Sequence, residues 1–255
     1  MFLIRPYRFI AGVISGMWTA NNATLEPLNS SMVAYWRGED LSDAKGSHNL
    51  TNNGGVTFTA GKHNNAFTLD GTNYLGGADS PDWDLPDFTI SVWFKNTSSN
   101  GHVYETRTSS NNTGYALIIY NGGLTFYSGD TGGVSMSSSA SGYDDGQWHH
   151  IVVARAGSSV TMYDNNSVVA TDSSSNAFPG FGMMIGCRYD NTKYLNGQVD
   201  GLAFWNGHGM TASEVSALYN NGDGSFYDPY NPNANAQLDD DGQPIQDDSG
   251  NNIED

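Results

Sequence analysis

Short apolar runs separated by polar, turn-forming residues fill residues 32–227 of this chain. Examples are Met32–Trp36, Phe88–Phe94 and Ile151–Ala154. The second run alternates in polarity with a period of two, as a half-buried strand does. Trp148 precedes the third run, where we expect it to anchor the strand in the core. The pattern predicts an all-β domain, and such sandwiches and barrels often extend to about 200–250 residues.

One segment has helical periodicity instead. Thr211, with Glu214 three residues later, has the sequence pattern of a capping box. Val215, Leu218 and Tyr219 follow as an apolar stripe. We therefore expect one short helix over residues 211–219, at the C-terminal end of the β domain.

The two ends of the chain differ in composition from the domain. Residues 1–31 begin with a basic stretch, and Phe9–Trp18 is mostly apolar. This composition fits a secretion signal, and it also fits an arm that packs on the domain or on a partner subunit. Trp18 stands where a cleavage site prefers a small residue, which favours the arm. Residues 228–255 hold eight acidic residues and no basic one, which predicts a flexible tail.

The net charge of the chain is −17, from 27 acidic and 10 basic residues. A protein that tracks phosphates needs a basic face, so this charge argues against nucleic acid and against anionic membrane surfaces as partners. No apolar run approaches the roughly 20 residues of a membrane-spanning helix. Cys187 is the only cysteine, so no internal disulfide forms, and its apolar neighbours predict a buried thiol.

Several motifs occur in order over residues 32–222. The most recognisable is DGQWHHI at Asp145–Ile151. Others read as an opening strand, an apolar–Asp–Gly turn, a TISVW strand and a closing strand: Val33–Asp40, Ala66–Gly71, Phe88–Phe94 and Gly197–Leu202. Together these motifs resemble the laminin G-like domains of the concanavalin A-like lectin/glucanase superfamily. The resemblance implies two antiparallel sheets packed as a jelly-roll sandwich.

The same resemblance implies a structural calcium ion. In the family, such an ion commonly lies where acids of the opening strand meet the Asp–Gly turn and the closing strand. Here the ligands would be Glu39 or Asp40, the carbonyl of Gly71, and Asp200. These are the hard oxygen ligands that calcium prefers. The alternative is an exposed acidic pair at residues 39 and 40 and a hydrogen-bonded strand end at Asp200.

The sequence lacks the signature of a glucanase. Such an enzyme needs two carboxylates that flank the scissile bond. Glu105 is the only glutamate in the middle of the domain, and no second acid stands at the spacing seen in related enzymes. His149 and His150 are adjacent, so on a strand they point to opposite faces and cannot bind one metal ion. We therefore expect no enzymatic activity, while a glycoside hydrolase with an atypical acid pair remains a third hypothesis.

Sugar recognition needs an aromatic ring beside polar groups that orient the ligand. The candidate residues of this kind are Arg188, Tyr189, Asp190, Asn191, Tyr104, Arg107 and Tyr120, and a further aromatic candidate is Tyr127. The stretch from 188 to 191 is the preferred group, because a guanidinium, a ring and two short polar side chains share one loop. For any single aromatic residue, a place at the edge of the core is the simpler interpretation.

The predicted function is that of a non-catalytic glycan-binding or adhesive module on a cell exterior or virion surface. It is based on the family resemblance and on the absence of a catalytic carboxylate pair. The main alternative is a structural assembly or decoration protein of a virus particle, which would dock on a capsid or fibre through residues 1–31. The two functions are compatible, because a displayed decoration module can also bind sugars.

Overall fold

The computed structural model of the 255-residue chain describes residues 30–107, 113–129 and 133–225. From Ser31 onward these residues belong to one compact unit. The predicted arm, apart from its last two residues, and the whole of the predicted tail at 228–255 lie outside the described residues. In the part of the chain that is described, no helix has the length and apolar character needed to cross a membrane.

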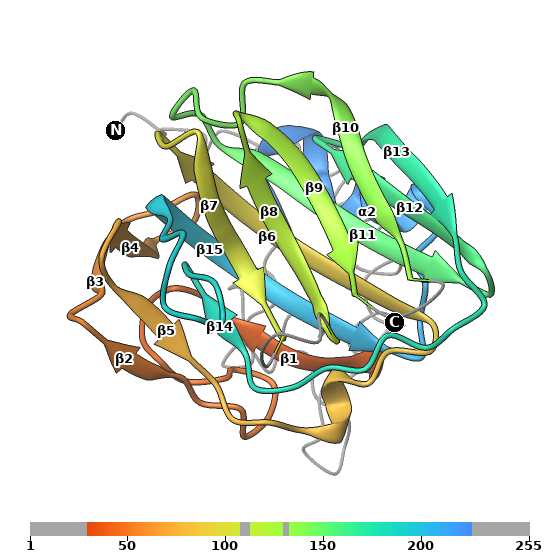
Figure 1. The fold of residues 1–255 in the computed structure, drawn as a ribbon, viewed down its shortest axis with the longest axis horizontal. Coiled ribbons are helices and arrows are strands. Elements are labelled where there is room, and N and C mark those ends of the chain that lie inside the picture. Colours follow the sequence, from red (N-terminus) through yellow and green to blue (C-terminus); the bar gives the residue numbers. More distant parts are fainter. Residues whose placement is uncertain (1–29, 108–112, 130–132, 226–255) are drawn as a thin grey trace, which may run out of the picture. The chain divides into compact units, whose positions relative to one another are not determined.

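Two antiparallel sheets form this unit, as the family resemblance implied. Within the described residues, the first sheet runs in the order β13 (Ser167–Ser173), β12 (Ser159–Asp164), β11 (His149–Ala156), β6 (Phe88–Asn96), β15 (Asn196–Asn206), β4 (Asn65–Asp70) and β3 (Thr57–Ala60), with β1 (Met32–Trp36) also paired to β15. The second runs in the order β10 (Ser135–Ser141), β9 (Gly123–Ser128), β8 (Tyr115–Tyr120), β7 (Asn100–Glu105), β14 (Met184–Ile185), β5 (Tyr74–Gly76) and β2 (Thr51–Asn53). In Figure 1, β7, β8 and β9 pass in front of β6, β11 and β15.

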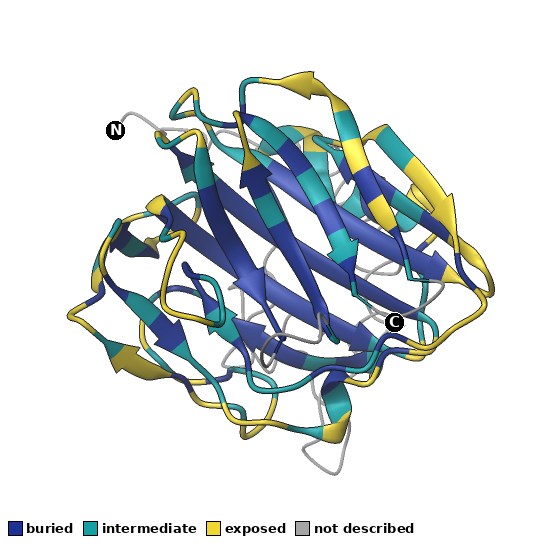
Figure 2. Cartoon of the chain, in the orientation of Figure 1, coloured by how far each residue is buried: buried dark blue, intermediate teal, exposed yellow. Residues whose placement is uncertain are grey.

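Aromatic side chains fill the space between the sheets. The ring centroid of Phe204 lies 5.3 Å from that of Trp83 and 6.1 Å from that of Trp36. Figure 2 shows the central strands β6, β11 and β15 buried along most of their length. Trp148 was expected in the core, but it is only partly buried, and Lys95 Nζ lies 5.1 Å from its ring centroid. The residue precedes β11, so the alternation of that strand does not direct its side chain inward.

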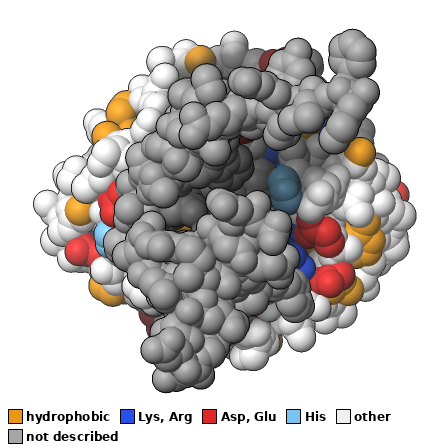
Figure 3. Space-filling model, turned by 180° about the vertical axis from the view of Figure 1, so that it is seen from behind, with side chains coloured by type: hydrophobic (Ala, Val, Ile, Leu, Met, Phe, Trp, Pro, Cys, Tyr) orange, Lys and Arg blue, Asp and Glu red, His pale blue; other side chains and the backbone are white. Residues whose placement is uncertain are grey.

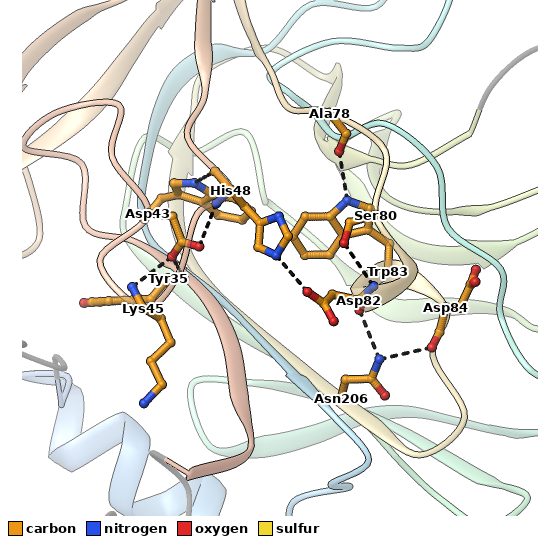
Figure 4. Close-up of polar contacts among 11 residues, drawn as sticks. Tyr35, Asp43, Lys45, His48, Ala78, Ser80, Asp82, Trp83, Asp84 and Asn206 are labelled. Atoms are coloured by element: carbon orange, nitrogen blue, oxygen red, sulfur yellow. Dashed lines mark hydrogen bonds and ion pairs between the residues drawn. The ribbon is translucent and has the colours of Figure 1, made fainter.

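A hydrogen-bonded loop follows β1 (Figure 4). Its centre is the carboxylate of Asp43, which accepts backbone N–H groups from Tyr35 and Lys45 at 2.9 Å and from His48 at 3.1 Å. Buried backbone donors are costly to leave unpaired, so this single carboxylate holds the turn in shape.

The same loop contacts the short 3₁₀ helix η2 (Pro81–Trp83). His48 Nε2 lies 2.8 Å from Oδ2 of Asp82, and the His48 ring packs on the Trp83 ring with centroids 4.6 Å apart (Figure 4). Nδ2 of Asn206 donates to the carbonyl of Asp82 at 3.2 Å. These contacts join three distant segments of the chain and explain the polar residues there as structural.

The helix α2 (Ala212–Tyr219) confirms the prediction from the capping box. The side chain of Thr211 accepts the backbone N–H of Glu214, and the Glu214 side chain accepts the backbone N–H of Thr211. At the other end of the helix, the ring of Tyr219 stacks on Trp93 and on His150, each with a centroid separation of 5.9 Å. The helix therefore covers part of the outer face of the first sheet.

Candidate functional site

A concave groove lies on the outer face of the second sheet, over β7, β8 and β9. On β9, Thr125 and Tyr127 face the groove because they alternate with Leu124 and Phe126, which are buried in the core. The groove has a volume of about 420 Å³, within the range typical of small-ligand sites. Its lining residues are Asn100, Gly101, His102, Arg107, Ile118, Ile119, Tyr120, Thr125, Tyr127, Arg188 and Lys193.

A β-bulge in β7 arranges the floor of the groove. The pairing of β7 with β8 shifts register between His102 and Tyr104, so that both Val103 and Tyr104 point into the core. His102 and Glu105 consequently share the outer face, and Nδ1 of His102 lies 2.5 Å from Oε2 of Glu105. Strict alternation over three residues would have placed these two side chains on opposite faces.

The guanidinium of Arg107 lies over two tyrosine rings. Its Cζ atom is 5.4 Å from the ring centroid of Tyr127 and 5.5 Å from that of Tyr189. Its Nε atom donates to Oε1 of Glu105 at 2.7 Å. The side chain is 7% exposed. Rings and carboxylate together fix the plane of the guanidinium at the wall of the groove.

The loop between β14 and β15 supplies the other two cations. The Arg188 guanidinium packs on the Tyr189 ring at 4.9 Å and lies 3.7 Å from a carboxylate oxygen of Asp190. The backbone N–H of Asn191 donates to the carbonyl of Arg188, which closes a tight turn. Lys193 is exposed, and its amine makes no ion pair within the described residues.

The structure places most of the predicted sugar-binding residues together. Those that line the groove are Arg107, Tyr120 and Arg188, together with Tyr127. Tyr189 stands beside Arg107, while Asp190 and Asn191 shape the loop that carries Arg188. Sequence reasoning missed Lys193, because a single lysine in a polar loop has no distinguishing pattern.

The assignment of Tyr104 as a sugar-binding residue needs correction. Its side chain is 1% exposed, and its ring centroid lies 5.9 Å from that of Phe204 in the core. The bulge at Val103 turns Tyr104 inward, so the ring is not accessible to a ligand in the groove.

The proposed calcium ligands come together only in part. Asp200 is fully buried, and its Oδ2 accepts the backbone N–H groups of Lys62 and His63, both at 2.9 Å. Burial raises the pKa of Asp200 to about 7, and the charge of Glu39 contributes to the rise. Oδ1 of Asp200 and Oε2 of Glu39 are both buried without a hydrogen-bond partner. Nε of Arg37 lies 3.6 Å from Oε2 of Glu39, too far for a hydrogen bond. Carboxylate oxygens that accept no hydrogen bond are chemically suited to a hard cation.

Asp40 and Gly71 do not join this pair. Oδ1 of Asp40 accepts the backbone N–H of Ser42 in an exposed turn. Gly71 follows Asp70, which pairs with Asn196 at the far end of β15. Asn196 lies four positions before Asp200 on β15, which is about 13 Å along the strand. Among the described residues, no group of three or more His, Cys, Asp and Glu side chains is arranged to hold a metal ion.

The adjacent histidines lie on opposite faces of β11, as predicted. His149 stacks on Phe94 with centroids 5.8 Å apart, whereas His150 stacks on Trp93 at 4.6 Å. Phe94 and Trp93 are themselves neighbours on β6 and point in opposite directions. Nε2 of His150 also lies 2.8 Å from Oγ of Ser91. Both rings are packed into the fold, which fits the structural role expected of them.

Solved structures with a similar fold include several binding domains. Domain 4 of AbnA, a GH43 extracellular arabinanase from Geobacillus stearothermophilus, solved with arabinotriose, is 16% identical over 76% of this chain and 98% of its own, with a TM-score of 0.60. The binding domain of paraclostridial mosquitocidal protein 1 is 16% identical over 87% of this chain and 57% of its own, with a TM-score of 0.61. The botulinum neurotoxin serotype D ligand-binding domain, solved with N-acetylneuraminic acid, is 13% identical over 77% of this chain and 52% of its own, with a TM-score of 0.64.

These similarities establish the fold. This chain spans little more than half the length of the two toxin domains. No curated protein matches the sequence.

A match to a family model shows the family of this chain. The model for the concanavalin A-like lectin/glucanases superfamily matches residues 69–216, a segment that includes every residue lining the groove. The matched segment is more than half of the 255 residues. The chain therefore belongs to the concanavalin A-like lectin/glucanases superfamily.

Proposed function

We propose that this protein is a non-catalytic glycan-binding module and that its ligand lies in the groove over β7, β8 and β9. The observation that carries the proposal is the position of Arg107, whose planar guanidinium lies over the rings of Tyr127 and Tyr189 at the groove wall. An aromatic surface beside oriented donors is the arrangement that sugars require.

Tyr120 supports the proposal from the end of β8. Its side chain is 65% exposed, and it is one of two large hydrophobic residues exposed among the described residues. A tyrosine ring in that position offers an apolar face to the C–H groups of a sugar and a hydroxyl to its polar edge. Arabinotriose and N-acetylneuraminic acid in the complexes of two similarly folded domains are consistent with a saccharide ligand.

The lining of the groove argues against hydrolysis. None of the described lining residues is acidic. Glu105 is fully buried beneath them, where His102 and Arg107 hold its two oxygens. Hydrolysis of a glycosidic bond normally uses two carboxyl groups, one on each side of the bond. Binding without catalysis is the function that this chemistry favours.

Tyrosine variants test the proposal. The wild-type chain is screened against immobilised polysaccharides and a glycan array, and each ligand found is titrated calorimetrically. We expect Tyr120→Ala and Tyr127→Ala to weaken binding by about tenfold or more, since loss of a stacked ring costs of the order of 1–2 kcal/mol. Tyr74→Ala, outside the groove on β5, is the matched control and should bind as the wild type does. Absence of saturable binding, or equal binding by all three variants, would contradict the proposal.

We also propose that the protein acts where glycans are accessible, on a cell exterior or a virion surface. Docking of residues 1–31 on a larger assembly, the main alternative, depends mostly on residues outside the described part of the chain.

A further inference from the structure

Building on the proposed function, we infer that the groove selects an acidic saccharide, whose carboxylate or sulfate group binds the guanidinium of Arg107. The inference depends on three observations: the unused donors of this guanidinium, the cations that surround it, and the absence of acidic residues from the described lining of the groove.

The first observation is the hydrogen bonding of Arg107. A guanidinium has five N–H donors in a fixed plane. Nε donates to Glu105, and the terminal nitrogens make no hydrogen bond to another described residue. The side chain nevertheless lines the groove while only 7% exposed. Two parallel donors on a fixed plane match the geometry of a carboxylate or sulfate.

The second observation is the concentration of positive charge. The chain has 10 Lys and Arg residues, and three of them, Arg107, Arg188 and Lys193, line this one groove. Glu105 balances Arg107 and Asp190 lies beside Arg188, but Lys193 has no acidic partner in the described part of the chain. The groove therefore carries an excess positive charge from Lys193.

The third observation is the contrast with the rest of the surface. The sequence contains 27 acidic residues, yet none of the described groove-lining residues is acidic. On the side of the molecule opposite to Figure 1, carboxylates stand out among the described side chains and cations are few (Figure 3). A net charge of −17 repels anions in general, so local cations are needed to admit one.

A neutral sugar would satisfy this groove less well. A neutral sugar would cover the terminal nitrogens of Arg107 with hydroxyl oxygens alone, and hydrogen bonds to neutral acceptors are weaker than those to a charged oxygen. An acidic group replaces the lost hydration with charge-assisted hydrogen bonds. Selectivity for the charged sugar follows from this difference.

Matched pairs of saccharides test the inference at constant sugar shape. Uronate oligosaccharides and sialosides are each compared with their methyl esters, and sulfated oligosaccharides with unsulfated ones, by array and then by calorimetry. We expect each neutral partner to bind at least about tenfold more weakly than its acidic form. The pairs also show whether carboxylate or sulfate is preferred. Raising the salt concentration from 50 to 500 mM should weaken only the acidic ligands, by several-fold.

Three variants complete the test. Lys193→Gln changes an exposed side chain, so the fold is retained, and we expect several-fold weaker binding of the acidic ligand. Arg107→Lys keeps the charge but removes the planar guanidinium, and it should lose most of the preference for acidic over neutral saccharides. Circular dichroism checks that this variant is folded. Lys95→Gln, on the first sheet, is the control and should bind as the wild type does.

The outcomes separate this inference from the proposed function. If neutral and acidic partners bind equally in the groove, the inference is wrong while the glycan-binding function stands. Unchanged selectivity in Lys193→Gln and in a folded Arg107→Lys also overturns it. If no saccharide of either kind binds, the inference and the proposed function both fail.

Discussion

Nε of Arg107 donates a 2.7 Å hydrogen bond to Oε1 of Glu105, a carboxylate with no exposed surface. The same carboxylate contacts His102, so one buried acid holds two groove residues. A buried charge that loses its partner is strongly destabilising, whereas an exposed ion pair contributes little. The floor of the groove is thus both part of the proposed site and part of the folded core.

The first prediction concerns this carboxylate. Glu105→Gln keeps the shape of the side chain but leaves Arg107 without its counter-charge, and we expect a loss of about 3 kcal/mol in the free energy of unfolding. Asp190→Asn removes an exposed acid from Arg188 and should cost less than about 1 kcal/mol. Denaturant titrations of both variants measure the difference. Equal losses would show that Glu105 is not the organising group of the groove.

The second prediction concerns pH and His150. Burial, with a smaller contribution from the charge of Lys62, lowers the pKa of His150 to about 3. The unfolded chain, with a histidine pKa near 6.5, therefore binds an extra proton between about pH 3 and 6.5, and stability must rise with pH in that window. From this residue alone we expect the free energy of unfolding to be about 2 kcal/mol lower at pH 5 than at pH 7.

Two variants isolate that contribution. His150→Gln should remove this part of the pH dependence, as seen in denaturant titrations at several pH values. The pKa of His149 shifts in the opposite direction. Burial lowers this pKa, but contacts with Asp164 and Asp145 outweigh burial and raise it overall. The contribution of His149 is present below about pH 6.5 and is lost as the pH rises above that value, so His149→Gln should remove a fall in stability above about pH 6.5 and leave the rise below it in place. If the free energy of unfolding of His150→Gln rises with pH as steeply as that of the wild type, His150 is not the source of this pH dependence.

The third prediction concerns the capping box of α2. Thr211→Ala removes the side chain that accepts the N–H of Glu214, and should lower the free energy of unfolding by about 1 kcal/mol. Thr211→Ser keeps the hydroxyl and should retain most of the stability. Because the helix lies on the outer face of the first sheet, neither variant should alter glycan affinity. Thermal melts and binding titrations measure both effects, and a weaker affinity in Thr211→Ala would count against the location of the groove.

The fourth prediction concerns calcium. We propose that the carboxylate oxygens of Glu39 and Asp200 that accept no hydrogen bond bind a calcium ion, with carbonyl oxygens and water as the further ligands. Added calcium should then raise the melting temperature of the wild type relative to a chelator. In Asp200→Asn and Glu39→Gln this shift should disappear. A wild-type melting temperature that is the same with calcium and with chelator contradicts the proposal.

Local sequence patterns were sufficient to predict an all-β domain with one helix, and the family resemblance implied the two packed sheets. The alternation in Phe88–Phe94 and the apolar run at Ile151–Ala154 mark the two strands that pair at the centre of the first sheet. The pairing of Thr211 with Glu214 marks the start of α2 because a capping box needs only residues three apart. Each of these features depends on neighbours in the sequence, which a single chain displays.

The site was predicted less completely because it depends on register and on distant contacts. A single extra residue at the β7 bulge reverses the direction of Tyr104 and brings His102 beside Glu105. Arg107 meets Tyr189 only after the loop between β14 and β15 returns to the second sheet. Gly71 was placed with Asp200 by family resemblance, but strand register separates them. No local pattern reports any of these relationships.

The most direct test of the central claim is a titration of isotope-labelled protein with an acidic oligosaccharide, followed by backbone amide chemical shifts. We expect saturable changes in chemical shift that are concentrated on β7, β8, β9 and residues 188–193, with little change on β11, β12 and α2. Changes centred on the first sheet, or none at saturating ligand, would contradict the assignment of the groove as the glycan-binding site.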